Sequence, residues 1–223
     1  MSSLPISSEK LPILENGDRV TRDEFEQRYH QMPNVKKAEL IEGTVYVPSP
    51  LRYNQHGLPH SQIMIWLGNY AIANSGLEIA DNTTVRLDAD NEVQPDALLR
   101  LDESMGGNSR ISEDDYVEGA PELIVEIAGS SVFYDVHDKL QVNRRNGVRE
   151  YLVWLVQDRE FRWYLWEEGR YRQQQPDESA TLKSPFFPGL WLDVPALLAG
   201  QMQQVLATVN SGINSGQHQE FVE

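Results

Sequence analysis

The strongest constraint on the fold comes from residues 150–156 (EYLVWLV), which are apolar at every position after the first. A strand with one face in water alternates apolar and polar residues, whereas a strand covered on both faces is apolar throughout. A similar run, 122–128 (ELIVEIA), precedes it. Between the two, residues 132–146 have a helical pattern that ends at Gly147, a residue suited to a left-handed helix C-cap. These segments predict a sheet with helices packed on it.

The length of 223 residues favours one domain with a buried core. We expect a flexible leader over 1–19, a single domain over 20–209 and a disordered tail over 210–223. The sequence predicts an α/β (α+β) fold with helices over 21–32, 59–74, 132–146 and 196–209, hairpins over 37–47 and 161–172, and strands over 83–87, 96–101, 122–128, 150–156 and 185–195.

Composition excludes several classes of protein. The chain has 34 acidic and 19 basic residues, a net charge of -15, whereas proteins that bind DNA or membranes without selectivity have basic surfaces. The lack of cysteine excludes a disulfide scaffold, a thiolate nucleophile and a cysteine zinc site. It also fits a reducing compartment, and we expect the cytoplasm. The longest apolar stretch, 63–73, is much shorter than the ~20 residues of a membrane span, so no membrane association is expected.

Two carboxylates fall on predicted strands. Asp96 begins one strand, and Glu126 lies inside an apolar one. A buried carboxylate is costly unless it is paired, hydrogen-bonded or bound to metal. A divalent cation between adjacent strands would remove the repulsion of the two acids, and Mg²⁺ favours one or two carboxylates with water and phosphate oxygens. The backbone carbonyl of Ile127 is a further candidate ligand. The alternatives are that Asp96 lies in solvent and that Glu126 pairs with an arginine.

A lysine lies on the helix predicted after Glu126. Lys139 and Asp135 are four residues apart and share one helix face. A lysine next to a metal site would stabilise charge at an attacked phosphate. The alternative is a surface ion pair between the two residues.

In order, these residues resemble the bacterial restriction endonuclease-like domains of the PD-(D/E)xK nuclease superfamily. The resemblance covers about residues 20–195. The matching pieces are Glu39-Leu-Ile-Glu-Gly43, His60 at a helix start, Pro95-Asp96, Pro121-Glu-Leu-Ile-Val-Glu126-Ile, Asp135 with Lys139, and Gly147-Val-Arg-Glu-Tyr151.

The resemblance implies a restriction endonuclease-like mixed sheet flanked by helices, with an N-terminal β-hairpin, extra C-terminal strands and a metal-dependent phosphodiesterase site. Asp96 matches the aspartate of the PD element, and Glu126 matches the acidic residue of (D/E)xK. The lysine expected two residues later is Ala128, and Lys139 would take its place from the helix. We therefore expect Asp96, Glu126 and Lys139 to be catalytic, with Mg²⁺ (or Mn²⁺) held by Asp96, Glu126 and the Ile127 carbonyl.

Three further residues are expected to support the site or contact substrate. Glu39 would be an additional metal ligand or a hydrogen-bond acceptor behind the ligands, and His60 would contact a substrate phosphate or a ligand carboxylate. Asp135 would act through Lys139. The alternatives are an edge-strand acid in solvent for Glu39 and a helix-capping or exposed histidine for His60.

The expected function is hydrolysis of phosphodiester bonds in DNA by a Mg²⁺-dependent endonuclease. Basic residues at 139, 144, 145 and 149 would supply local attraction for DNA. The alternative is a catalytically inactive member of the fold that acts as a binding or assembly module, favoured by the acidity and the missing strand lysine. A sugar hydrolase is disfavoured, because the tryptophans fall mostly in strands where core packing explains them.

A homodimer is a further expectation. Cutting two strands requires two sites, and the hairpin over 161–172 offers an aromatic edge for self-association.

Overall fold

The computed structural model describes residues 11–48, 50–129 and 132–222, and its centre is a mixed six-stranded sheet. In spatial order the strands are β12 (Arg170–Gln173), β11 (Glu160–Glu167), β10 (Glu150–Leu155), β9 (Leu123–Ala128), β6 (Ala97–Leu101) and β3 (Leu77–Asp81). Strands β9 and β10 are parallel, and the other neighbours are antiparallel. Both parallel strands are buried at every position, as their uninterrupted apolar sequences predict.

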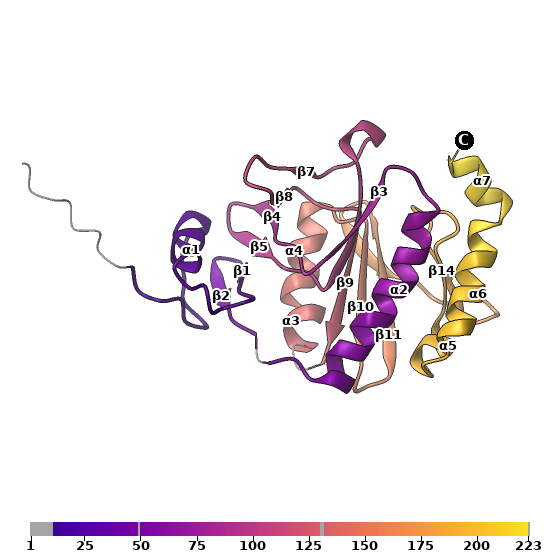
Figure 1. Cartoon of the computed structure of the whole chain (residues 1–223), viewed down its shortest axis with the longest axis horizontal. Helices are drawn as coiled ribbons and strands as arrows, with labels where there is room; N and C mark the ends of the chain where they lie inside the picture. The colour runs from indigo at the N-terminus through magenta and orange to yellow at the C-terminus, as the bar shows by residue number, and fades with distance from the viewer. Residues whose placement is uncertain (1–10, 49, 130–131, 223) are drawn as a thin grey trace, which may run out of the picture.

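Helices cover both faces of this sheet (Figure 1). On one face lie α2 (Leu58–Ile72), α5 (Val194–Leu198), α6 (Met202–Ile213) and α7 (Gly216–Val222). On the other lie α3 (Val132–Val136) and α4 (Asp138–Asn146). Successive strand residues alternate between two cores: Val125 and Leu152 pack with α2 and α6, whereas Ile124 and Val153 pack with α4 and a second sheet.

The second sheet is small and holds the N-terminal hairpin. Its order is β2 (Thr44–Tyr46), β1 (Glu39–Ile41), β5 (Asn91–Val93), β4 (Val85–Asp88), β8 (Val117–Glu118) and β7 (Arg110–Ile111). The predicted hairpin is confirmed, with Glu42 and Gly43 both at positive φ in its turn. The link from β5 to β6 carries Gln94, Pro95 and Asp96 from this sheet into the central one.

Several elements differ from the sequence prediction. The helix expected over 132–146 is broken at His137 into α3 and α4. Strands β3, β5, β7 and β8 were not predicted, because each is short and lacks a clear alternating pattern. The extended segment over 185–195 is largely a loop that enters β14 (Trp191–Asp193), which pairs with β13 (Thr181–Lys183).

The predicted disordered tail over 210–223 is wrong for the residues described. Helix α6 continues to Ile213 and α7 follows, with His218 buried and its Nε2 lying 3.0 Å from Asn74 Oδ1. Gly212 fits closely against the backbone of Gly189, where a methyl group would lie 2.2 Å from the Gly189 oxygen. Contact through small residues does not show in a hydropathy pattern, which explains the error.

The predicted leader lies partly outside the described residues. Of its described part, Leu14 is buried, and the Arg28 guanidinium of α1 (Arg22–Tyr29) donates to the carbonyls of Pro12 and Ile13. Residues 11–19 therefore pack against α1. Helix α1 begins as predicted at Thr21, whose hydroxyl accepts from the Glu24 amide.

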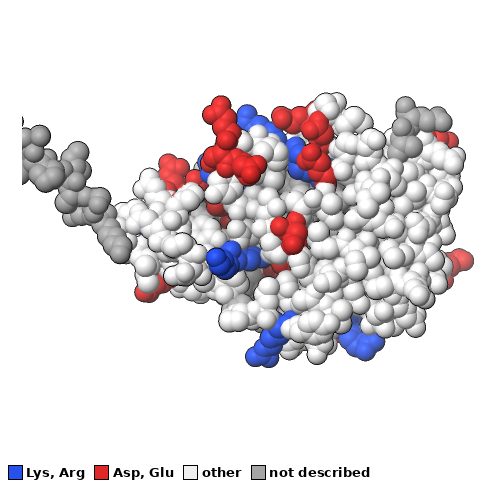
Figure 2. All heavy atoms as spheres, viewed as in Figure 1, with Lys and Arg blue, Asp and Glu red and all other residues white. Residues whose placement is uncertain are grey.

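Charge is distributed unevenly over the surface. Figure 2 shows acidic side chains gathered over the upper edge, whereas the face formed by α2 and α6 is nearly free of charge. The sequence explains this, because residues 58–77 and 194–219 contain no Asp, Glu, Lys or Arg. None of the helices in the described ranges has the length and apolar character needed to cross a membrane.

Candidate active site

Sheet register brings the two predicted carboxylates together. Ala97 pairs with Val125 in the antiparallel contact between β6 and β9, and one step further along the same register Asp96 lies opposite Glu126. Opposed residues of an antiparallel pair project to the same face. The Ile127 amide donates to Asp96 Oδ2 at 2.8 Å, which fixes that carboxylate on the sheet.

The Lys139 ammonium lies among three carboxylates. Its Nζ is 3.0 Å from Glu39 Oε2, 3.2 Å from Glu126 Oε1 and 3.4 Å from Asp135 Oδ1. All four side chains are buried. The lysine reaches Glu126 from α4, since that helix packs on the face of β9 to which Glu126 points. The surface ion pair considered for Lys139 and Asp135 is thereby replaced by a buried cluster.

Asp96 Oδ1 contacts two side chains that the sequence did not suggest. Lys37 Nζ lies 3.3 Å and His56 Nε2 lies 3.1 Å from this oxygen. Lys37 precedes β1, and His56 lies in the π-helical turn η1 (Tyr53–Gly57) before α2. We use "acid cluster" for the four carboxylates Glu39, Asp96, Glu126 and Asp135 together with the two lysines Lys37 and Lys139.

The remaining predicted residues have defined positions around the cluster. Glu39 Oε1 accepts from the Gln94 amide at 2.8 Å, so β1 is tied to the link that carries Asp96. His60 Nε2 lies 2.8 Å from the Asp96 carbonyl oxygen and 3.0 Å from Asp81 Oδ1. His60 thus contacts the backbone of Asp96, not its carboxylate. The Ile127 carbonyl accepts from the Gly129 amide at 3.1 Å, and only the amide of Ile127 contacts a cluster side chain within the described residues.

Burial and charge shift the pKa values of the cluster in opposite directions. Burial alone would raise the pKa of Asp96, but the His56 contact and the positive charge of Lys37 hold it below its usual range. The pKa of Glu126 is well above its usual value because burial and the neighbouring carboxylates both disfavour its ionised form. Burial alone would lower the pKa of Lys139, yet the surrounding carboxylates, Glu126 first, raise it, so its amine stays protonated.

The donor set has the chemistry of a site for a divalent cation. Four carboxylates face two lysines, a formal excess of two negative charges in a buried place. Mg²⁺ and Mn²⁺ prefer such oxygen ligands. A cation would compensate Glu126, whose pKa is raised first by burial and then by the neighbouring carboxylates. Among the described residues no three His, Asp or Glu side chains are already arranged as a metal site. The Lys139 ammonium lies among Glu39, Glu126 and Asp135, where it takes the place of a cation.

Each basic residue expected to attract DNA has a partner within the protein. Besides Lys139, Arg144 donates to the Gly169 carbonyl, Arg145 forms an ion pair with Glu42, and Arg149 stacks over the Phe186 ring. Arg145 and Arg149 are nevertheless exposed, so the attraction of DNA by this helix and its exit stays a prediction.

Sequence reasoning missed Lys37 and His56. His56 precedes His60 by four residues, and the two rings lie 5.5 Å apart, so helical spacing offered a weak signal. Lys37 gave no signal, because its contact with Asp96 spans 59 residues of chain.

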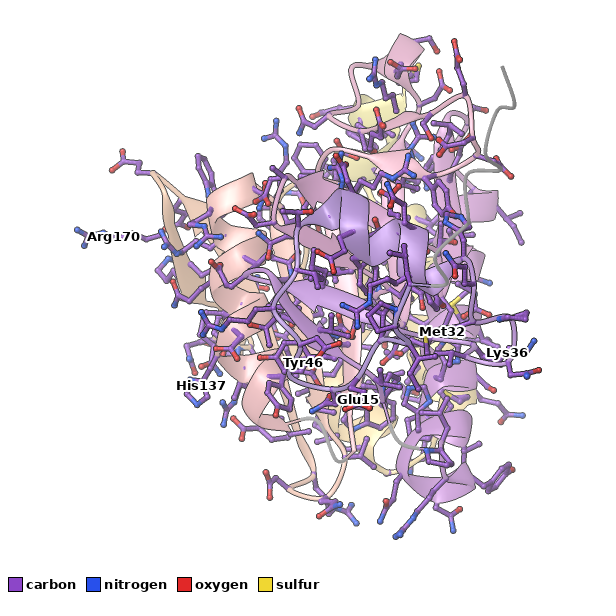
Figure 3. The ribbon with its side chains drawn as sticks, turned by 90° about the vertical axis from the view of Figure 1, so that its left-hand side faces the viewer. Glu15, Met32, Lys36, Tyr46, His137 and Arg170 are labelled. Carbon is purple, nitrogen blue, oxygen red and sulfur yellow. The ribbon has the colours of Figure 1, made fainter. Side chains whose placement is uncertain are left out.

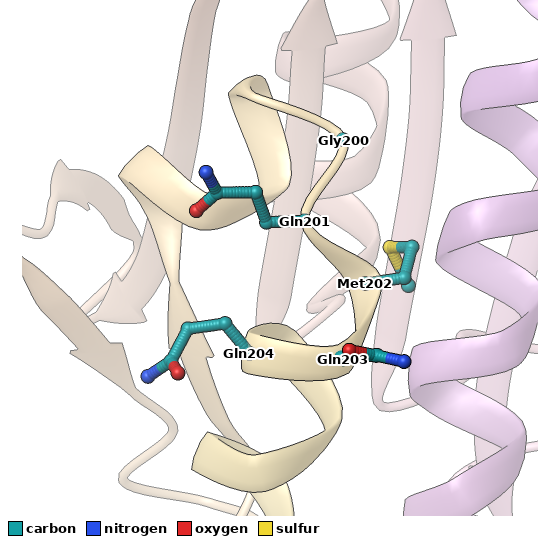
Figure 4. Close-up of a pocket in the computed structure, with 5 residues that line it drawn as sticks. All are labelled: Gly200, Gln201, Met202, Gln203 and Gln204. Atoms are coloured by element: carbon teal, nitrogen blue, oxygen red, sulfur yellow. The ribbon is translucent and has the colours of Figure 1, made fainter.

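A surface pocket elsewhere on the molecule has different chemistry. It lies at the turn between α5 and α6 and is lined by Gly200, Gln201, Met202, Gln203 and Gln204 (Figure 4). None of these side chains is ionisable, so the pocket offers no acid, base or anionic metal ligand.

Comparison with known proteins identifies the family and the fold. The model of the Uma2 family, described as "Putative restriction endonuclease", matches residues 22–195. The crystal structure of a "putative nuclease belonging to DUF820" from Anabaena variabilis ATCC 29413 has a TM-score of 0.58 at 13% identity, covering 85% of this chain and 99% of that one. At that identity the likeness shows the fold. No curated protein matches the chain significantly. Since the family match extends over most of the sequence and includes every member of the acid cluster, the protein belongs to the Uma2 family of restriction endonuclease-like proteins.

Proposed function

We propose that this protein is a metal-dependent endonuclease that hydrolyses phosphodiester bonds in DNA, with Mg²⁺ or Mn²⁺ as cofactor. The family indicates a nuclease-like function. The observation that carries the finer proposal is the acid cluster, in which four carboxylates from separate elements meet two lysines with an excess of negative charge. Asp96 and Glu126 would hold the cation, with Glu39 as the next candidate.

Each residue of the cluster has a distinct task in this proposal. A bound divalent cation supplies Lewis-acid chemistry at the phosphate. Lys139 keeps its proton because of its raised pKa, so it acts as a positive charge and not as a base. It orients Glu126 and Glu39 and offsets negative charge that develops on the substrate. Burial raises the pKa of Glu126, and a cation held there would favour its ionised form.

The decisive experiment combines metal binding with cleavage of supercoiled plasmid. We expect Mn²⁺ to raise the Tm of the wild type but not that of Asp96→Asn or Glu126→Gln. We expect nicked and linear plasmid with the wild type in Mg²⁺ or Mn²⁺, and at least ~100-fold slower cleavage by either variant. Plasmid that stays intact with folded, metal-bound protein would instead favour the non-cleaving binding module.

We propose further that the active form is a homodimer. The hairpin of β11 and β12, in which the sequence suggested an aromatic edge, lies at one end of the central sheet with Trp166 partly exposed. The mass in solution by light scattering tests this. We expect twice the chain mass for the wild type and a shift toward the monomer for Trp166→Glu. A monomeric wild type at all concentrations would contradict it.

A further inference from the structure

The two lysines of the acid cluster are held very differently. Lys139 contacts three carboxylates, and its side chain is 5% exposed. Lys37 forms one ion pair within the described part of the chain, with Asp96, and its side chain is 19% exposed. Lys37 also lies in the irregular segment before β1, and not in a helix. Its flexible four-carbon stem can therefore move without disturbing a packed element.

Lys37 contacts the oxygen that a metal would need. Asp96 Oδ2 already accepts from the Ile127 amide, so Oδ1, which also lies 3.1 Å from His56 Nε2, is the oxygen that a cation would use. The Lys37 ammonium lies 3.3 Å from Oδ1. A divalent cation held by Oδ1 would lie close to the Lys37 ammonium. Repulsion between the two cations would favour departure of the lysine, whose side chain is free to move.

We propose that Lys37 is a displaceable counter-ion of Asp96, whose ammonium neutralises Oδ1 in the metal-free protein and leaves when a divalent cation binds. This inference rests on the proposed metal site. It assigns opposite effects to two lysines of one cluster: Lys139 organises the carboxylates, whereas Lys37 competes with the metal.

The neighbouring residue offers a matched control. Lys36 is exposed, and its Nζ lies 3.4 Å from the Pro33 carbonyl; Figure 3 shows it at the margin of the molecule. Lys36→Met and Lys37→Met change the net charge equally and at adjacent positions, so long-range electrostatics affect both alike. Only Lys37→Met removes the contact with Asp96. Lys37→Arg keeps a positive charge next to Asp96 but changes the shape of the side chain, so it controls for effects of altered packing.

The test measures the Kd for Mn²⁺ by isothermal titration, with Tm in EDTA and in saturating Mn²⁺ as a second readout. We expect Lys37→Met to bind Mn²⁺ ~10-fold tighter than the wild type, and Lys36→Met and Lys37→Arg to stay within ~2-fold of it. In EDTA, Lys37→Met should have a lower Tm than the wild type, because Asp96 has lost its counter-ion. In saturating Mn²⁺ the difference in Tm between the two proteins should become smaller, because the variant binds the metal more tightly.

Two outcomes would overturn the inference, and they differ. If the wild type binds Mn²⁺ through Asp96 but Lys37→Met binds it equally or more weakly, Lys37 is not a competitor, and the metal site stands. If the wild type shows neither heat of binding nor a Tm shift, the metal site itself is wrong and the inference falls with it.

Discussion

Replacing Lys139 by Met should destabilise the metal-free protein strongly and in a pH-dependent way. The substitution keeps most of the side-chain volume but removes the charge that faces Glu39 at 3.0 Å and Asp135 at 3.4 Å. At an effective dielectric constant of about 20, each contact is worth on the order of 5 kcal/mol before desolvation is counted. Returning the ammonium to water offsets much of this. Breaking a buried pair in this way typically costs about 3–5 kcal/mol, and we expect that loss here.

The sign of the pH dependence follows from the carboxylates left behind. Without the lysine, burial and mutual repulsion raise their pKa values in the folded state, as Glu126 already shows. A carboxyl group with a raised folded-state pKa stabilises the fold at low pH, and that stability is lost as pH rises. The cost of Lys139→Met should therefore be smaller at about pH 5 than at about pH 8.

Urea denaturation in EDTA at both pH values measures this cost. Lys183→Met is the control, because Lys183 pairs with Asp177 in an exposed ion pair and its loss should cost less than about 1 kcal/mol at either pH. A cost for Lys139→Met below about 1 kcal/mol, or one that does not vary with pH, would refute the view of Lys139 as the counter-ion of a buried acid cluster.

Three further predictions concern other parts of the structure. Glu126→Gln should change the free energy of unfolding by less than about 1 kcal/mol in EDTA, because burial raises the pKa of this carboxyl and so disfavours its charged form in the folded protein; a loss above about 3 kcal/mol in urea denaturation would contradict this. Burial raises the pKa of Glu150 to about 7, and Ser184 donates to it at 2.5 Å. Ser184→Ala should therefore cost about 1 kcal/mol near pH 5 and about 2–3 kcal/mol near pH 8.5, where the carboxylate is charged; equal costs at the two pH values would be the contrary result. Gly212→Ala places a methyl group 2.2 Å from the Gly189 oxygen and should lower stability by about 2–3 kcal/mol in a thermal melt, whereas an unchanged Tm would show that α6 can shift freely.

The acid pair illustrates how much of the site could be predicted. Asp96 and Glu126 stood out because a charged residue in or beside an apolar strand needs a partner, which is a local property of sequence. That argument identified Asp96 and Glu126 as buried acids, but it did not identify the side chains that contact them. The arginine considered for Glu126 is in fact Lys139, thirteen positions away and on another element.

The contacts of Lys139 depend on how helix α4 packs on strand β9. Spacing alone favoured a surface ion pair with Asp135. Two residues four positions apart share a helix face whether that face is exposed or buried, so the spacing does not reveal burial. The structure buries that face against β9 and thereby brings Glu126 and Glu39 to the same amine. The break at His137 adds to this, since α4 starts one residue before Lys139.

The sequence by itself determined the local features of this protein: the two fully buried strands, the hairpin turn at Glu42 and Gly43, and the need of two buried acids for compensation. Each follows from the residues within one segment. Only the tertiary structure decided that Lys37 contacts Asp96, that the C-terminal residues form helices against α2, and which of the two lysines is the more exposed. Those contacts join segments far apart in the chain, and their energies depend on burial and distance, which no single segment contains.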